Sequence, residues 1–161
     1  MTIQVGDRLP EAKFRVMTSD GLQVKTTDDV FKGKKVALFA VPGAYTGTCH
    51  KMHIPSIFLN AYAMKDKGVD TIAVVSVNDA FVMSAWKRDT DQRDEAIFLA
   101  DGNAEFAKAI GMELDASGNG LGIRSKRYSM LVEDGVVKKF NLEPNPGKVE
   151  VSGGDTLLGQ L

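Results

Sequence analysis

The stretch that decides the fold is Lys35-Val36-Ala37-Leu38-Phe39-Ala40-Val41-Pro42-Gly43-Ala44-Tyr45-Thr46-Gly47-Thr48-Cys49. Its first half is almost continuously apolar, which is typical of a strand that is covered on both faces of a sheet. The Pro42-Gly43 pair cannot continue a ladder of backbone hydrogen bonds, so we expect the strand to end there. From Cys49 to Lys67 apolar residues recur at helical spacing. The stretch therefore predicts a buried strand, a short loop and a helix that begins at Cys49.

Strands and helices are also predicted on both sides of this unit. Pro55 predicts a kink in the helix, Gly68 is a typical C-cap, and Asp134-Gly135 is typical of a two-residue hairpin turn. The alternation of elements predicts one α/β domain over residues 1–161, with a mixed central sheet and helices on both faces. The remaining expected elements are strands Ala12–Met17 and Leu22–Lys25, a helical turn ending at Gly33, strand Thr71–Val77, helix Ala80–Lys87, strand Ile97–Ala100, helix Ala104–Ile110, strands Arg127–Val132 and Val136–Leu142, and helix Gly154–Leu161.

The composition excludes several classes of protein. The 161 residues carry 20 basic and 21 acidic side chains, a formal net charge of −1, which argues against general affinity for nucleic acid or anionic membranes. The longest apolar run, Val36–Val41, is far shorter than the ~20 residues that span a bilayer. Residues 1–10 include Asp7 and Arg8 and have no apolar core, unlike a secretory signal. We therefore expect a cytoplasmic protein without nucleic-acid or membrane partners.

Cys49 is the only cysteine, so the chain cannot form an internal disulfide, and a redox cycle needs an external thiol. The predicted first turn of a helix has free N–H groups and the positive end of the dipole, which both stabilise an anion. The thiolate is the nucleophilic form of cysteine. A lone cysteine is also commonly a small buried hydrophobic residue. Its position at a helix start, after a Pro/Gly/Thr loop, favours an activated thiol.

Two histidines beside Cys49 suggest alternatives that the spacing does not favour. Cys49 and His53 can share a helix face, but His50 lies about 100° away around the helix, which makes a poor zinc site. A cysteine hydrolase normally takes its general base from elsewhere in the fold, whereas both histidines lie on the same segment as Cys49. We expect neither a metal nor another cofactor, and we expect His53 to pack near the loop before Cys49.

Pro42, Thr46 and Cys49, with three and two residues between them, resemble the proline–threonine–cysteine signature of peroxiredoxins. The wider sequence resembles the peroxiredoxin 5 subfamily, called type II in plants, from about residue 30 to residue 145. The matching segments are Val41–Thr46, Lys51, His53–Pro55, Ser76–Val82, Leu99–Gly102, Leu121–Ser125 and Arg127–Met130. The resemblance implies a thioredoxin-like fold and a thiol-dependent peroxidase with antioxidant activity.

The resemblance also implies roles for individual residues. Cys49 matches the peroxidatic cysteine, and Thr46 matches the residue whose hydroxyl hydrogen-bonds the thiolate and the peroxide. Pro42 matches the residue that covers the pocket and limits access of water. Arg127 matches the arginine that holds the thiolate and polarises the peroxide, a role that suits a fixed cation. By residue type alone Arg127 is equally consistent with a solvated charge at a strand end, as are its neighbours Arg124 and Lys126.

The sequence departs from the family pattern at two positions. Gly47 stands where the family usually has proline, which should make the loop less rigid. We also expect Gly47 and Thr48, with N–H groups of the helix start, to line the peroxide pocket. Val151 stands near the place where some relatives have a resolving cysteine. Cys49 would therefore be oxidised to a sulfenic acid and reduced through a mixed disulfide with an external thiol. Relatives use glutathione with glutaredoxin, which the missing cysteine favours here, or thioredoxin.

The resemblance further implies a homodimer packed through the active-site edge, with Ala44, Tyr45 and residues near Phe81 at the contact. Apolar residues in the loop from Pro42 to Thr46 fit this contact, and they fit a lidded pocket equally. A different hypothesis is a redox sensor, in which slow oxidation of Cys49 reports peroxide without efficient turnover. Gly47 and the missing resolving thiol are consistent with this second hypothesis.

Overall fold

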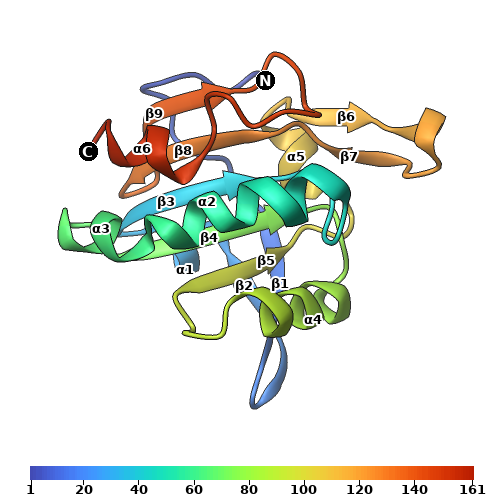
Figure 1. Ribbon diagram of the computed structural model, residues 1–161, viewed down its shortest axis with the longest axis horizontal. Helices are drawn as coiled ribbons and strands as arrows, with labels where there is room; N and C mark the ends of the chain where they lie inside the picture. The colour runs from blue at the N-terminus through green and yellow to red at the C-terminus, as the bar shows by residue number, and fades with distance from the viewer.

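The computed structural model describes all 161 residues and contains a seven-stranded sheet in the order β2-β1-β5-β4-β3-β8-β9 (Figure 1). Its strands are β1 Lys13–Thr18, β2 Gly21–Thr26, β3 Lys35–Ala40, β4 Thr71–Ser76, β5 Ala96–Ala100, β8 Tyr128–Glu133 and β9 Val136–Leu142. The helical elements are α1 Thr27–Phe31, the π-helical turn η1 Cys49–His53, α2 Ile54–Leu59, α3 Ala61–Asp66, α4 Ala80–Thr90, α5 Glu105–Ala109, the 3₁₀ turn η2 Ser117–Asn119 and α6 Gly154–Leu158.

The predicted mixed sheet is confirmed. Strand β3 runs parallel to β4, and β4 runs parallel to β5, whereas β8 pairs with β3 in the antiparallel sense. The β1–β2 and β8–β9 pairs are the two predicted hairpins. Asp134 and Gly135 in the second hairpin both have positive φ, 49° and 79°, which a primed turn requires. The β3 strand therefore lies well inside the sheet and ends beside the loop that leads to Cys49.

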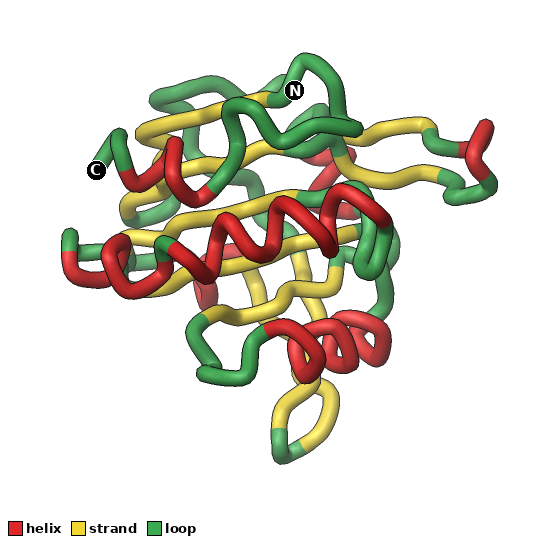
Figure 2. The backbone as a smooth tube through the Cα atoms, viewed as in Figure 1, coloured by secondary structure: helices red, strands yellow, loops and turns green.

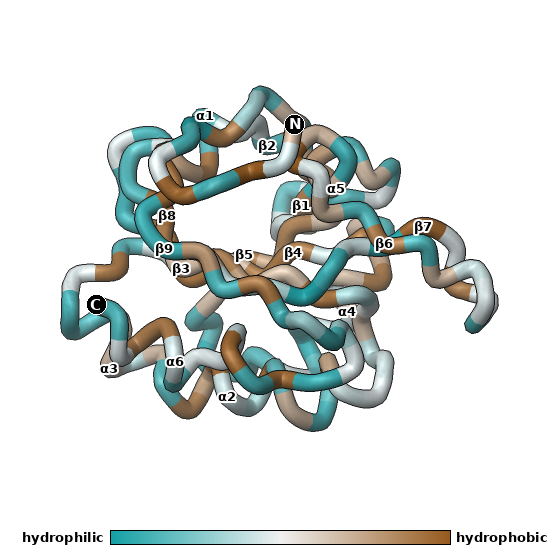
Figure 3. The backbone as a smooth tube through the Cα atoms, turned by 90° about the horizontal axis from the view of Figure 1, so that it is seen from above, coloured by the Kyte–Doolittle hydropathy of each residue, from teal (hydrophilic) through white to brown (hydrophobic).

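Helices cover both faces of the sheet (Figure 3). Along β3, Ala37 and Phe39 face the core under α2, α3, α4 and α6, whereas Val36 and Leu38 face the core under α1 and α5. This alternation follows from the two-residue period of a strand, and it explains why β3 is apolar almost throughout. None of the helices has the length and apolar character that crossing a bilayer would need.

The helix that follows Cys49 differs from the single kinked helix that the sequence predicts. It begins as the π-helical turn η1, in which the Ile54 N–H donates to the Cys49 carbonyl. Pro55 has no N–H to donate to the carbonyl four residues earlier, so the irregularity falls just before it rather than as a bend at Pro55. A second break, at Asn60, separates α2 from α3. Gly68, with φ of 102°, ends α3 as predicted.

A two-stranded arm was not predicted. Strands β6, Glu113–Asp115, and β7, Ile123–Ser125, pair with each other and project from the sheet, with η2 between them (Figure 2). The strands have only three residues each, and the connection between them is polar and rich in glycine, so the sequence has no periodic pattern here. The prediction for β8 was also slightly wrong, because the strand begins at Tyr128 and leaves Arg127 just outside it.

Candidate active site around Cys49

The local structure places Cys49 in the first turn of a helix, as predicted. The helical backbone begins at Gly47, and the His50 N–H donates to the Thr46 carbonyl at 2.9 Å. The thiol itself is buried, with 1% of the residue exposed, at the edge of the core that also contains Phe39 and Ile54. A sulfur in this position is shielded from bulk water and lies near free N–H groups of the helix start. In this setting a nearby cation would act strongly on the sulfur, because little water lies between them to screen the charge.

Arg127 supplies that cation. Its Nη2 donates to Cys49 Sγ at 3.0 Å, its Nε donates to the Pro146 carbonyl at 2.9 Å, and its Nη1 lies 2.9 Å from His53 Nδ1. Only 2% of Arg127 is exposed. All three guanidinium nitrogens therefore have a partner, and the charge is held rigidly against the sulfur. The structure brings together two residues that lie 78 positions apart in the chain.

His53 is fully buried and contacts Arg127. Its Nε2 lies 2.9 Å from the Ser152 carbonyl, which can only accept, so Nε2 carries the proton. Its Nδ1 faces an N–H of Arg127 and must therefore present a lone pair. Burial, and secondly the charge of Arg127, lower the pKa of His53 to about 4. The neutral imidazole thus accepts a hydrogen bond from Arg127. The sequence predicted that His53 packs near the loop, but it did not predict the contact with Arg127.

Three of the other predicted residues, Thr46, Gly47 and Thr48, directly precede Cys49 in the chain, and none of them is hydrogen-bonded to its sulfur. The Thr46 hydroxyl donates to the Gly43 carbonyl at 2.7 Å; since a hydroxyl has one proton, the expected hydrogen bond to the thiolate is not formed here. The Thr48 hydroxyl donates to the Gly147 carbonyl at 2.8 Å. Gly47 is exposed, and a Cβ added to it would contact nothing within 4 Å. The hydroxyls of Thr46 and Thr48 are therefore held by backbone carbonyls rather than by the thiol.

Pro42 is partly buried at the end of β3, and the arm contacts it. Arg124, on β7, lies with its Nη1 3.4 Å from the Pro42 carbonyl, and its Nε donates to the Leu121 carbonyl at 2.9 Å. A Cβ at Gly43 would lie 2.9 Å from the same Arg124 nitrogen, so glycine permits this close approach. Arg124 is therefore not a freely solvated charge, as residue type alone allowed, but packs on the outside of the loop.

His50 points away from the thiol toward α4. Its Nδ1 accepts from Trp86 Nε1 at 2.9 Å, and its ring stacks on Tyr45, whose hydroxyl donates to Asp89. Tyr45 has a positive φ of 63°, so this stack fixes an unusual turn of the loop. A metal ion bound by both Cys49 and His53 would need to lie between them. Arg127 contacts both of these residues instead. The site therefore places a guanidinium, rather than converging ligands, beside the sulfur.

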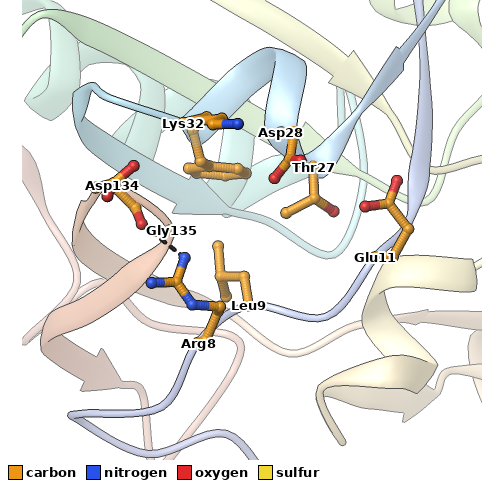
Figure 4. Close-up of a pocket in the computed structure, with 9 residues that line it drawn as sticks. Arg8, Leu9, Glu11, Thr27, Asp28, Lys32, Asp134 and Gly135 are labelled. Carbon is orange, nitrogen blue, oxygen red and sulfur yellow. Dashed lines mark hydrogen bonds between the residues drawn. The ribbon is translucent and has the colours of Figure 1, made fainter.

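A separate hollow of about 260 Å³ lies beside α1 and the β8–β9 turn (Figure 4). Both cations and carboxylates line it, and Arg8 Nη1 donates to the Asp134 carbonyl across it. Neither Cys49 nor Arg127 contributes to it. The hollow is therefore separate from the thiol and from the guanidinium that contacts it.

A known protein family and curated proteins match nearly the whole chain. The redoxin family model matches residues 4–158. Peroxiredoxin-2E, a chloroplastic protein of Arabidopsis thaliana, is 45% identical to this chain over 97% of the chain and 68% of its own length. The chain belongs to the peroxiredoxin family. Hybrid peroxiredoxin hyPrx5 of Haemophilus influenzae is another peroxiredoxin relative, 44% identical over all of this chain and 67% of its own length.

Solved peroxiredoxins share the fold along the whole chain. Reduced Prx3 of Vibrio vulnificus in complex with hydrogen peroxide has a TM-score of 0.93 and 46% identity, with 99% of each chain covered. Peroxiredoxin 5 of Alvinella pompejana has a TM-score of 0.86 and 35% identity, covering 97% of this chain and 96% of that one. The predicted thioredoxin-like fold is confirmed. This peroxiredoxin is a thiol-dependent peroxidase of the peroxiredoxin 5 type, with a single cysteine.

Proposed function

We propose that Cys49 is the peroxidatic cysteine and that Arg127 activates both the thiolate and the peroxide. The observation that carries this proposal is the 3.0 Å contact between Arg127 Nη2 and Cys49 Sγ. The thiolate attacks one peroxide oxygen in line with the O–O bond; the S–O bond forms as the O–O bond breaks. The departing oxygen takes up a proton and leaves as water or an alcohol. A fixed cation beside the reacting atoms stabilises the charge that develops on that oxygen.

The surrounding residues have supporting roles in this proposal. Pro42 covers the sulfur and limits access of water, while Thr46 exchanges its bond to Gly43 for one to the peroxide. Gly47 and Thr48 contribute the N–H groups of the helix start, which can receive the oxygens of the substrate. Hydrogen peroxide is a suitable substrate because it is small enough for a buried thiol. The peroxide-bound Prx3 of Vibrio vulnificus supports this choice.

The proposed reductant is glutathione with glutaredoxin, with thioredoxin as the alternative. The sulfenic acid on Cys49 has no second cysteine in the chain to condense with. An external thiol must therefore form a mixed disulfide, with release of water, and a second thiol must then release Cys49 as thiolate. A tripeptide thiol is favoured because only 1% of Cys49 is exposed, which leaves little room for a protein thiol.

We also propose that the enzyme is a cytoplasmic homodimer that packs through the active-site edge. Tyr45 is 44% exposed and Phe81 is 68% exposed, so both present apolar surface. The Ala44 N–H donates to Asn78 Oδ1 at 2.9 Å, which ties the loop to the segment that leads into α4, where Phe81 lies. The use of a single free cysteine suits a reducing compartment. Sedimentation at micromolar concentration tests the dimer, and fractionation of cells that express the full-length protein tests the location.

The deciding experiment measures peroxide consumption with glutathione plus glutaredoxin and, in parallel, with thioredoxin plus its reductase. Sustained turnover in either system supports the proposal and identifies the reductant, provided that Cys49→Ser abolishes this turnover. Consumption of one peroxide per Cys49 without recycling would contradict the proposed reductants and would favour the redox sensor instead. Turnover that persists in Cys49→Ser would refute the assignment of the nucleophile.

A further inference from the structure

A buried carboxylate lies outside the machinery described so far. Glu143 follows β9 directly and is 5% exposed. Its Oε2 accepts four hydrogen bonds: from the N–H groups of Glu150, Val151 and Ser152 at 2.9, 2.8 and 2.8 Å, and from Ser152 Oγ at 2.7 Å. Its Oε1 is buried without a partner. Burial alone would raise the pKa of Glu143, but these hydrogen bonds outweigh it and lower the pKa, so the group is an anion.

Residues 143–152 form the segment that we call the C-terminal loop. The Glu143 carboxylate joins the two ends of this loop, because it accepts from residues 150–152. Three of its backbone carbonyls face the active site: Pro146 accepts from Arg127 Nε, Gly147 accepts from the Thr48 hydroxyl, and Ser152 accepts from His53 Nε2. Glu143 also donates its own N–H to the Arg127 carbonyl at 3.0 Å. Two of the three contacts of the Arg127 guanidinium therefore depend on the C-terminal loop, Nε directly and Nη1 through His53.

We propose that Glu143 is a positioning residue for the peroxidase reaction, whose carboxylate shapes the C-terminal loop so that its carbonyls aim Arg127 at Cys49. The inference rests on the roles proposed above for Cys49 and Arg127. Near its middle the loop is held by its own turn at Asn145, but residues 150–152 converge on Glu143. The Ser152 carbonyl fixes the proton of His53 on Nε2, which leaves Nδ1 free to accept from Arg127. Glu143 thus acts on the guanidinium through His53.

The anionic form of the side chain is essential to this arrangement. In Glu143→Gln, an amide oxygen in the place of Oε2 faces the four donors without the negative charge that strengthens these bonds, and an NH₂ group takes the buried place of Oε1, which has no hydrogen-bond partner. The opposite orientation turns the NH₂ group toward four donors. Neither orientation preserves the loop, although the substitution keeps the volume of the side chain. The outcome should be an Arg127 that is displaced from the sulfur rather than an unfolded protein.

The experiment compares Glu143→Gln with Glu113→Gln, an exposed glutamate on β6 without a side-chain hydrogen bond. Stopped-flow mixing of reduced protein with hydrogen peroxide gives the rate constant of Cys49 oxidation. We expect Glu143→Gln to slow oxidation by about 10- to 100-fold, since a displacement of about 1 Å can cost 100-fold. Glu113→Gln should stay within about twofold. A Glu143→Gln rate within about twofold of wild type would overturn the proposal.

A double-mutant cycle with Arg127→Ala separates positioning from general damage to the fold. If Glu143 acts through Arg127, Glu143→Gln should cost nothing further once Arg127 is removed. An equal loss in both backgrounds would overturn the proposal. If Glu143→Gln does not fold, Ser152→Ala, which removes one donor to Glu143, goes through the same cycle with the same criteria. An Arg127→Ala enzyme that oxidises at the wild-type rate would instead refute the role of Arg127 itself.

Discussion

Acid should destabilise this protein through His53. The pKa of His53 is lowered to about 4 in the fold, by burial first and by Arg127 second, against 6.5 in the unfolded chain. Between these values the unfolded chain binds a proton that the folded chain does not. The free energy of unfolding therefore falls as the pH falls from 6.5 to about 4, and His53 contributes no further loss below that. A gap of about 2.5 units corresponds to roughly 3 kcal/mol, a large share of the ~5–15 kcal/mol of a typical domain.

Urea unfolding followed by circular dichroism, at a series of pH values between 7 and 4, measures this loss. His53→Gln is the comparison, because its amide can still donate to the Ser152 carbonyl but does not titrate. Carboxylates titrate in both proteins, so they cancel in the difference between the two curves. The variant should be less stable near pH 7, and its stability should fall less steeply on acidification. Parallel curves would show that His53 is not a buried neutral imidazole.

Four further predictions concern the site and its surroundings. Cys49→Ser should abolish peroxide consumption and leave the circular dichroism spectrum unchanged. Arg127→Ala should slow Cys49 oxidation in stopped flow by at least about 100-fold, because it removes the cation 3.0 Å from the sulfur. Gly47→Pro should raise the free energy of unfolding by about 0.4–1 kcal/mol, since Gly47 is the first helical residue and a Cβ there meets nothing within 4 Å. A lower stability in urea unfolding would contradict this prediction. Phe81→Glu should shift the proposed dimer to monomer in sedimentation, and an unchanged coefficient would place the contact elsewhere.

The fold was predictable where the sequence signal is local. The apolar run of β3 and the Asp134-Gly135 turn are determined by residues that are neighbours in the chain, and the structure confirms both. The helix start next to Cys49 is also a local signal, although the helix begins two residues earlier than predicted, at Gly47. The break at Asn60 was not predictable, because the apolar stripe continues through it into α3. The arm of β6 and β7 was missed because three-residue strands carry too little pattern.

The site was predictable only in part, because its members converge in space rather than in sequence. Cys49 could be selected from its position before a helix, but Arg127 required the family resemblance. Nothing near Glu143 distinguishes it from the exposed glutamates of the chain; its importance depends on the hydrogen bonds that fold the C-terminal loop. The acceptor role of His53 likewise depends on Ser152, which lies 99 positions away. Such contacts leave no spacing that a sequence pattern can reveal.

The long separation between the parts of the site has a consequence for biosynthesis. Cys49 emerges from the ribosome about 100 residues before Ser152, and Arg127 emerges in between. Since translation adds ~5–20 residues per second, the Cys49 thiol of the nascent chain stays unburied for on the order of 10 seconds. During that interval the cysteine lacks the contact with the Arg127 guanidinium that it makes in the fold. Given the roles proposed for Cys49 and Arg127, peroxide reactivity would begin late, only when translation has delivered the last strands and the segment that follows them.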